Sequence, residues 1–176
     1  IMDTVLVLQI DNSLDYLIKD LLEVEAHLLK LTNEHLNTYM AGRTLGQHAL
    51  PITFGKKTGT WLAENRRNIE RLEHVRSKVQ RSGVLKGAVG SYLGLGEKAI
   101  ETEAIMMNKL GLAEPSKDDW HGIRDVFAEY AVTLAIISKS FGRIGNELTL
   151  LQMTELGETE EDLGSDAVGS LSLIHI

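Results

Sequence analysis

Cysteine is absent from the 176 residues of the chain. This absence excludes disulfide scaffolds, cysteine-ligated zinc sites and thiol catalysis, and it fits a reducing compartment. No apolar run approaches the roughly 20 residues that a membrane-spanning helix needs. The first residues also lack the basic segment of a signal peptide. We therefore expect a cytoplasmic protein with no part in a membrane.

Proline is scarce, and basic residues are outnumbered. Only Pro51 and Pro115 occur, so helices can run far without interruption. The chain has 18 lysines and arginines against 25 acidic residues, a net charge of -7. The arginines between 66 and 81 alternate with glutamates, which is typical of a solvated helix face. Nothing here resembles the basic stripe of a nucleic-acid-binding protein, so no nucleic-acid partner is expected.

Apolar residues recur at three- and four-residue spacings over most of the chain, which predicts helices. The expected helices span 3–39, 53–82, 97–110 and 120–155. A break at 41–51 and a glycine-rich loop at 83–96 separate the first three. No alternating pattern of any length indicates a strand. The expected fold class is all-α, a bundle of long helices.

The break between the first two helices carries an unusual set of polar groups. It places Arg43, Thr44, Gln47 and His48 within one short segment that ends at Pro51. An arginine fork together with neutral donors suits a carboxylate ligand. The alternative is an ordinary polar turn with a capping threonine, and local chemistry alone favours this alternative.

Two further places can bind a ligand. Backbone N–H groups of the loop Gly87–Ser91 can cradle an anion, although a plain flexible connection is the simpler interpretation. On the last helix, a buried Asn146 would need polar partners and would reach a ligand. The six histidines form no HExxH pair, and no Walker, GxSxG or dinucleotide motif occurs. No metal and no cofactor are expected.

Taken in order, these segments resemble the central region of the fumarase/aspartase superfamily. The similarity favours the branch that holds adenylosuccinate lyase and 3-carboxy-cis,cis-muconate cycloisomerase. Residues 3–9 resemble the end of the first motif, and residues 42–55 resemble the second. The segments 87–91, 120–125 and 150–158 also fall where the family has its motifs.

The resemblance implies a homotetramer whose core is a large helical bundle. Its active sites would be composite, with motifs from three subunits. The substrate would be a small polycarboxylate. The typical reaction is a β-elimination that releases fumarate, and the cycloisomerase runs a related ring closure. Both proceed through a dianionic aci-carboxylate, which preorganised donors stabilise.

The resemblance also implies roles for single residues. Thr44 and Gln47 match contacts to the substrate carboxylate, and Arg124 and Asn146 match less closely. Ser91 belongs to a matching loop. Ser170 stands where the signature loop begins, at the position of the general base.

Two departures from the family pattern bear on function. Leu45 occupies the position of the histidine that acts as general acid, and a leucine cannot transfer a proton. This change, together with the Trp120–Asp125 segment, favours a cycloisomerase-like enzyme. An adenylosuccinate lyase is the alternative, and a non-catalytic helical relative is a second one. Leu45 favours the non-catalytic relative, whereas the retained Thr44, Gln47 and Ser170 favour an enzyme.

The second departure concerns the tail. Residues 171–176 do not continue the signature loop that Gly169-Ser170 begins, which indicates a foreign tail. We therefore expect a partial central helical-bundle domain at 1–156, the start of the signature loop at 157–170, and a tail at 171–176 that does not match the family. We expect no activity from this chain alone.

Overall fold

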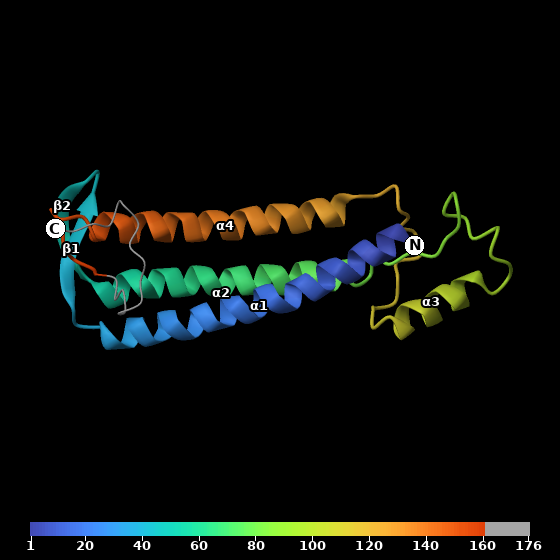
Figure 1. The fold of residues 1–176 in the computed structure, drawn as a ribbon, viewed down its shortest axis with the longest axis horizontal. Coiled ribbons are helices and arrows are strands. Elements are labelled where there is room, and N and C mark those ends of the chain that lie inside the picture. Colours follow the sequence, from blue (N-terminus) through green and yellow to red (C-terminus); the bar gives the residue numbers. More distant parts are fainter. Residues whose placement is uncertain (161–176) are drawn as a thin grey trace, which may run out of the picture. The chain divides into compact units, whose positions relative to one another are not determined.

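The computed structural model describes residues 1–160 of the chain. Its elements are α1 (Met2–Glu34), β1 (Tyr39–Thr44), β2 (Gln47–Thr53), α2 (Phe54–Val79), α3 (Ala99–Lys109) and α4 (Asp125–Leu151) (Figure 1). The chain forms two compact units, Ile1–Ser140 and a second that begins at Phe141, and α4 belongs in part to each. The predicted all-α class is confirmed. None of the helices within residues 1–160 is long and apolar enough to cross a membrane.

The helices α1 and α2 lie side by side and antiparallel in the first unit (Figure 1). Their buried residues follow a seven-residue repeat. On α1 they include Val7, Leu14, Leu21 and Leu28, and on α2 they include Thr58, Trp61, Asn65, Asn68, Leu72, Val75 and Val79. This repeat returns to the same helix face along the whole contact, as in a coiled coil. It explains how two helices this long stay packed against each other.

Polar side chains interrupt this apolar contact at fixed points. Asn65 donates from Nδ2 to the carbonyl oxygen of Leu21 at 2.8 Å. The hydroxyls of Thr32 and Thr58 lie 3.0 Å apart. A buried polar group is costly unless it is paired, so a sliding of α1 along α2 would break these bonds. The hydrogen bonds therefore select one register for the two helices.

The expectation of no strand at 41–51 is wrong, because β1 and β2 form an antiparallel hairpin there. Its turn has two residues, Leu45 and Gly46, both with positive φ, of 52° and 73°. Such a turn matches the twist of two strands. Both strands are exposed or half-buried along their length, so they carry no apolar alternation that would reveal them. The hairpin also ends the first helix earlier than expected.

The other boundaries follow from local structure. Thr53 caps α2, since its Oγ1 accepts a hydrogen bond from the N–H of Lys56 at 3.1 Å. The loop expected at 83–96 is irregular, as predicted. The last helix begins at Asp125 and not at residue 120, because Ile123 N–H donates to the carbonyl of Trp120 in a turn.

Candidate functional site

The hairpin divides its four candidate residues between two faces. Thr44 lies opposite Gln47 across the strands, and Arg43 lies opposite His48. Directly opposed residues of an antiparallel pair project to the same face, and successive residues project to opposite faces. Thr44 and Gln47 therefore share one face, while Arg43 and His48 share the other. Sequence analysis grouped these four residues as one candidate site, but a small ligand bound on one face can contact only one of the two pairs.

Leu45 is fully exposed at the tip of this hairpin, with 100% of its side chain accessible. An apolar side chain in a turn with positive φ is unusual, because such positions favour glycine or asparagine. Among residues 1–160, no side chain buries Leu45 or packs against it. Its position between Thr44 and Gln47 makes it part of whatever surface these two residues present.

The base of the hairpin is tied to the ends of both long helices. The carbonyl oxygen of His35 accepts hydrogen bonds from the N–H groups of Gly55 at 2.9 Å and Thr38 at 3.3 Å. The ring of His35 also stands edge-on to Phe54, with centroids 5.2 Å apart. These contacts place the hairpin as a continuation of the α1–α2 pair.

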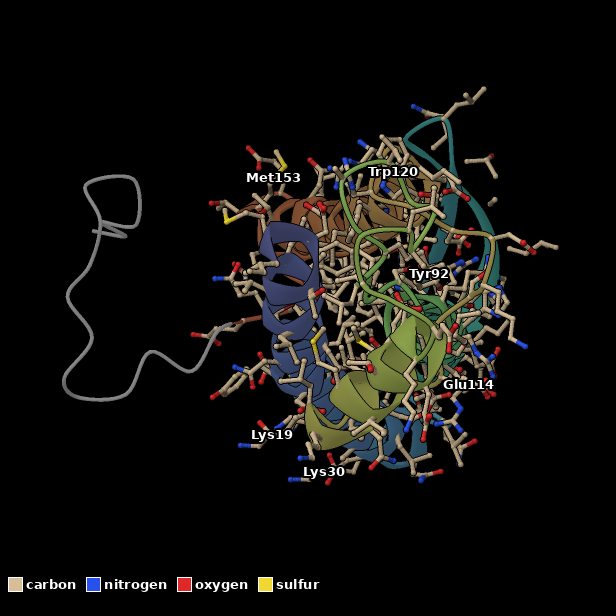
Figure 2. All side chains as sticks on the ribbon, turned by 90° about the vertical axis from the view of Figure 1, so that its right-hand side faces the viewer. Lys19, Lys30, Tyr92, Glu114, Trp120 and Met153 are labelled. Atoms are coloured by element: carbon tan, nitrogen blue, oxygen red, sulfur yellow. The ribbon has the colours of Figure 1, made fainter. Side chains whose placement is uncertain are left out.

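The second candidate region, the loop that carries Ser91, lies near the start of α1. Ser91 itself is exposed. Its neighbour Tyr92 donates from its hydroxyl to Oε2 of Glu103 at 2.6 Å, and Glu103 is only 2% exposed. Burial, together with the hydrogen bond to Glu103, raises the pKa of Tyr92, so its hydroxyl stays protonated and keeps donating. Figure 2 looks onto this end of the first unit, with Tyr92 and Trp120 labelled.

Arg124 lies close to the same loop and is held by the first motif. Its Nη1 lies 2.6 Å from Oδ1 of Asp3 at the start of α1. The next residue, Thr4, donates from its hydroxyl to the carbonyl of Val84 at 3.0 Å and accepts from the N–H of Val84 at 3.2 Å. The first motif therefore connects the loop to Arg124. This role of Asp3 and Thr4 requires their pairing with residues some 80 to 121 positions away, which no local pattern reveals.

A cavity of about 400 Å³ opens beside these contacts. It is lined by the start of α1, the beginning of the loop and the Trp120 turn, and its polar or charged lining residues are Asp3, Lys86, Trp120 and His121. Lys86 is 3% exposed, and its Nζ donates to the carbonyl oxygens of Ser116 and Asp119. Sequence analysis did not select Lys86, Tyr92 or Glu103, although a lysine beside a glycine-rich loop is a local signal that could have pointed to Lys86.

The structure does not bring all candidates together in one chain. The hairpin follows the end of α1, whereas the Ser91 loop and Arg124 lie at its start. With 33 residues, α1 is roughly 50 Å long at 1.5 Å per residue. Asn146 is exposed on the part of α4 in the second unit, so burial does not force it to take a partner. Ser170 lies outside the described residues.

The whole arrangement matches a known family. The family model described as Lyase matches residues 1–173, so the chain belongs to this family, within the fumarase/aspartase superfamily. The chain is 39% identical over 175 residues to the N-acetyl-S-(2-succino)cysteine lyase of Dickeya dadantii. It is also 39% identical over 175 residues to the adenylosuccinate lyase of Pyrococcus horikoshii. A 3-carboxy-cis,cis-muconate cycloisomerase of Pseudomonas aeruginosa is 37% identical over 176 residues.

Solved structures agree with this assignment. A fumarate lyase from Mesorhizobium sp. BNC1 matches 89% of this chain and 36% of its own, with a TM-score of 0.84 and 37% identity. The 3-carboxy-cis,cis-muconate lactonizing enzyme from Pseudomonas putida matches 89% of this chain and 35% of its own, with a TM-score of 0.83 and 35% identity. The three curated relatives each match 99% of this chain, which spans only 38% to 39% of their length.

Proposed function

We propose that this chain is the central part of an enzyme that acts on a polycarboxylate, with 3-carboxy-cis,cis-muconate-type cycloisomerisation as the reaction. Thr44 and Gln47 support a polycarboxylate substrate, because they share one exposed face at the tip of the hairpin. Their hydroxyl and amide supply neutral donors for a carboxylate. Relatives with lyase and cycloisomerase names are similarly identical to the chain, so identity alone does not select the reaction.

The exposed Leu45 is the observation that supports cycloisomerisation. An elimination that releases an amine needs an acid, because an unprotonated amide ion is a very poor leaving group. In the cycloisomerase reaction the group that adds to the double bond is a carboxylate. Carboxylates ionise near pH 4 and need no proton to attack or to leave. A leucine at position 45 is compatible with this chemistry and not with efficient release of an amine.

A fumarate-releasing lyase with a sulfur leaving group is the second candidate. Its support is the Dickeya relative, whose name describes a succinylated cysteine. A thiol ionises near pH 8.5, so a thiolate leaves more easily than an amine without an acid. Adenylosuccinate, whose elimination breaks a carbon–nitrogen bond, fits Leu45 least well. We propose Ser170 as the residue that exchanges the proton with the substrate carbon: as general base it removes that proton in an elimination, and in ring closure its hydroxyl returns one to the aci-carboxylate after the carboxylate has added.

The proposed enzyme assembles as a tetramer in the cytoplasm with composite sites. The roughly 50 Å between the two candidate regions supports such a site, since no small substrate spans the length of α1. Leu22, Leu29 and Leu36 support the assembly. Leu22 and Leu29 lie on α1, and Leu36 lies just beyond its end; the three recur every seven residues and remain about half exposed in the single chain. A repeated apolar stripe of this kind fits a helix of another subunit.

The test uses the full-length protein and three substrates: carboxymuconate, an S-succinylated cysteine and adenylosuccinate. We expect turnover of carboxymuconate and little turnover of adenylosuccinate. Both reactions are measured by the change in absorbance of the substrate or product. The substitution Leu45→His should raise adenylosuccinate cleavage by roughly 10²-fold, since general acid catalysis contributes that much or more. Efficient cleavage of adenylosuccinate by the wild type would refute the reasoning from Leu45. No turnover of any of the three would support a non-catalytic relative.

A further inference from the structure

The loop that carries Ser91 is closed at both ends by one buried carboxylate. Oε1 of Glu103, on α3, accepts a hydrogen bond from the N–H of Leu85 at 2.6 Å, just before the loop. Oε2 accepts from the hydroxyl of Tyr92 at 2.6 Å, just after it. Hydrogen bonds to a buried charged acceptor are stronger than neutral ones. Glu103 therefore spans the loop from one side.

The backbone and a lysine complete this closure. The N–H of Tyr92 donates to the carbonyl oxygen of Lys86 at 3.0 Å, which joins the residues directly flanking Gly87–Ser91. The Nζ of Lys86 lies 5.8 Å from the centre of the Tyr92 ring. That ammonium also donates to the carbonyls of Ser116 and Asp119. The loop is thus a closed ring whose two ends are held by buried groups.

The middle of the loop packs against the turn before α4. A Cβ on Gly90 would lie 2.7 Å from the indole ring of Trp120, so only glycine fits there. Gly87 and Gly90 both have positive φ, of 79° and 77°. Tyr92 also has a positive φ, of 61°, which is uncommon for an aromatic residue. Strained backbone of this kind persists only where surrounding contacts hold it.

We propose that Glu103 and Tyr92 are positioning residues that hold the Ser91 loop in the shape that binds a substrate carboxylate. This inference rests on the proposed function, because it assigns the loop to a polycarboxylate site. In this role neither side chain needs to touch the substrate, since Glu103 is buried and Tyr92 is half-buried. Their contribution is preorganisation: the exposed Ser91 and its neighbouring N–H groups stay in place before the ligand arrives.

The experiment replaces Tyr92 by phenylalanine in the full-length protein. The variant Tyr92→Phe removes one hydroxyl and leaves Glu103 with the N–H of Leu85. We expect faster amide hydrogen exchange over residues 86–92. We also expect KM for the substrate, and the Kd of succinate as a dicarboxylate probe, to rise about 10- to 100-fold, a range typical of a displaced binding group. The value of kcat should change much less, since the loop binds ground state and transition state alike.

Two comparisons separate positioning from a general loss of stability. Tyr130→Phe also removes a half-buried tyrosine hydroxyl, which lies 2.9 Å from the hydroxyl of Ser13. This contact joins α1 to α4 and lies outside the Ser91 loop. Tyr130→Phe should leave loop exchange, KM and the Kd of succinate unchanged. Glu103→Gln keeps the shape and one acceptor, and should retain most of the affinity, whereas Glu103→Leu should lose it.

Each outcome decides the proposal. It is overturned if Tyr92→Phe behaves like Tyr130→Phe, or if loop exchange rises while KM and the Kd of succinate stay at wild-type values. A wild type that binds succinate but converts none of the three substrates would refute the proposed reactions, and the succinate Kd would still test the loop. A wild type that neither binds nor converts them would overturn both.

Discussion

Gly55, at the start of α2, packs so closely against the end of α1 that it leaves no room for a side chain. A Cβ there would lie 2.7 Å from the carbonyl oxygens of both Thr32 and His35. Even a favourable C–H···O contact keeps about 3.3–3.6 Å between carbon and oxygen. Both oxygens belong to the backbone, so neither rotates away. The substitution Gly55→Ala must therefore push α2 and the hairpin away from α1.

The size of the effect follows from two opposing terms. Overpacking of a rigid contact costs about 1–3 kcal/mol, and alanine in place of a helical glycine returns up to about 1 kcal/mol. We expect Gly55→Ala to destabilise the protein by about 1–2 kcal/mol. The matched control is Gly59→Ala, one turn further along α2. There the added Cβ would lie 3.5 Å from Cγ2 of Thr32, an ordinary contact, so the helix gains about 0.5–1 kcal/mol.

Urea unfolding of both full-length variants, followed by far-ultraviolet circular dichroism, measures these shifts through the transition midpoint. The two alanine variants should move the midpoint in opposite directions. A Gly55→Ala midpoint equal to that of Gly59→Ala would show that the α1 end and the α2 start do not touch as described. The contacts of His35 with Thr38 and Gly55 would then not hold the hairpin as described, and the positions described for Thr44 and Gln47 would be wrong.

Two further predictions concern assembly and pH. The double substitution Leu22→Glu and Leu29→Glu places charges on the exposed apolar stripe of α1. It should lower the sedimentation coefficient of the full-length protein without changing its helical content. An unchanged sedimentation coefficient would contradict assembly through this stripe. Because burial raises the pKa of Tyr92, the native state keeps a proton that the unfolded chain loses near pH 10. The stability that this group contributes is therefore fully present below pH 10, and above pH 10 it falls by at most about 1.4 kcal/mol per pH unit. The free energy of unfolding of Tyr92→Phe should therefore decline less steeply at alkaline pH than that of Tyr130→Phe.

The long helices could be predicted from sequence because their buried residues repeat. Leu72, Val75 and Val79 are spaced so that they return to one face, and this spacing is visible without coordinates. The hairpin was missed for the opposite reason. Its strands bury neither face, and its turn uses Leu45 and Gly46 in place of the asparagine–glycine or aspartate–glycine pair that marks a two-residue hairpin.

For the candidate site, the sequence offers a set of residue types but not their grouping. The polar break at 41–51 indicated carboxylate chemistry, but the division of Thr44 and Gln47 from Arg43 and His48 depends on the strand register. The closure of the Ser91 loop depends on Glu103, which lies 18 residues after Leu85 in another element. Contacts of this kind arise from tertiary packing, and no periodic pattern encodes them.

The register of the hairpin makes a prediction that kinetics can decide. If one substrate carboxylate is bound on the face of Thr44 and Gln47, these two residues act on the same group, and the effects of Thr44→Val and Gln47→Ala should not add. Side chains that share a ligand typically couple by about 0.5–3 kcal/mol. His48 projects from the opposite face, so Thr44→Val and His48→Ala should add within about 0.5 kcal/mol. The cycles are measured as kcat/KM of the full-length protein on its best substrate. Strong coupling between Thr44 and His48, with none between Thr44 and Gln47, would contradict this assignment. It would show that the ligand contacts residues on both faces of the hairpin.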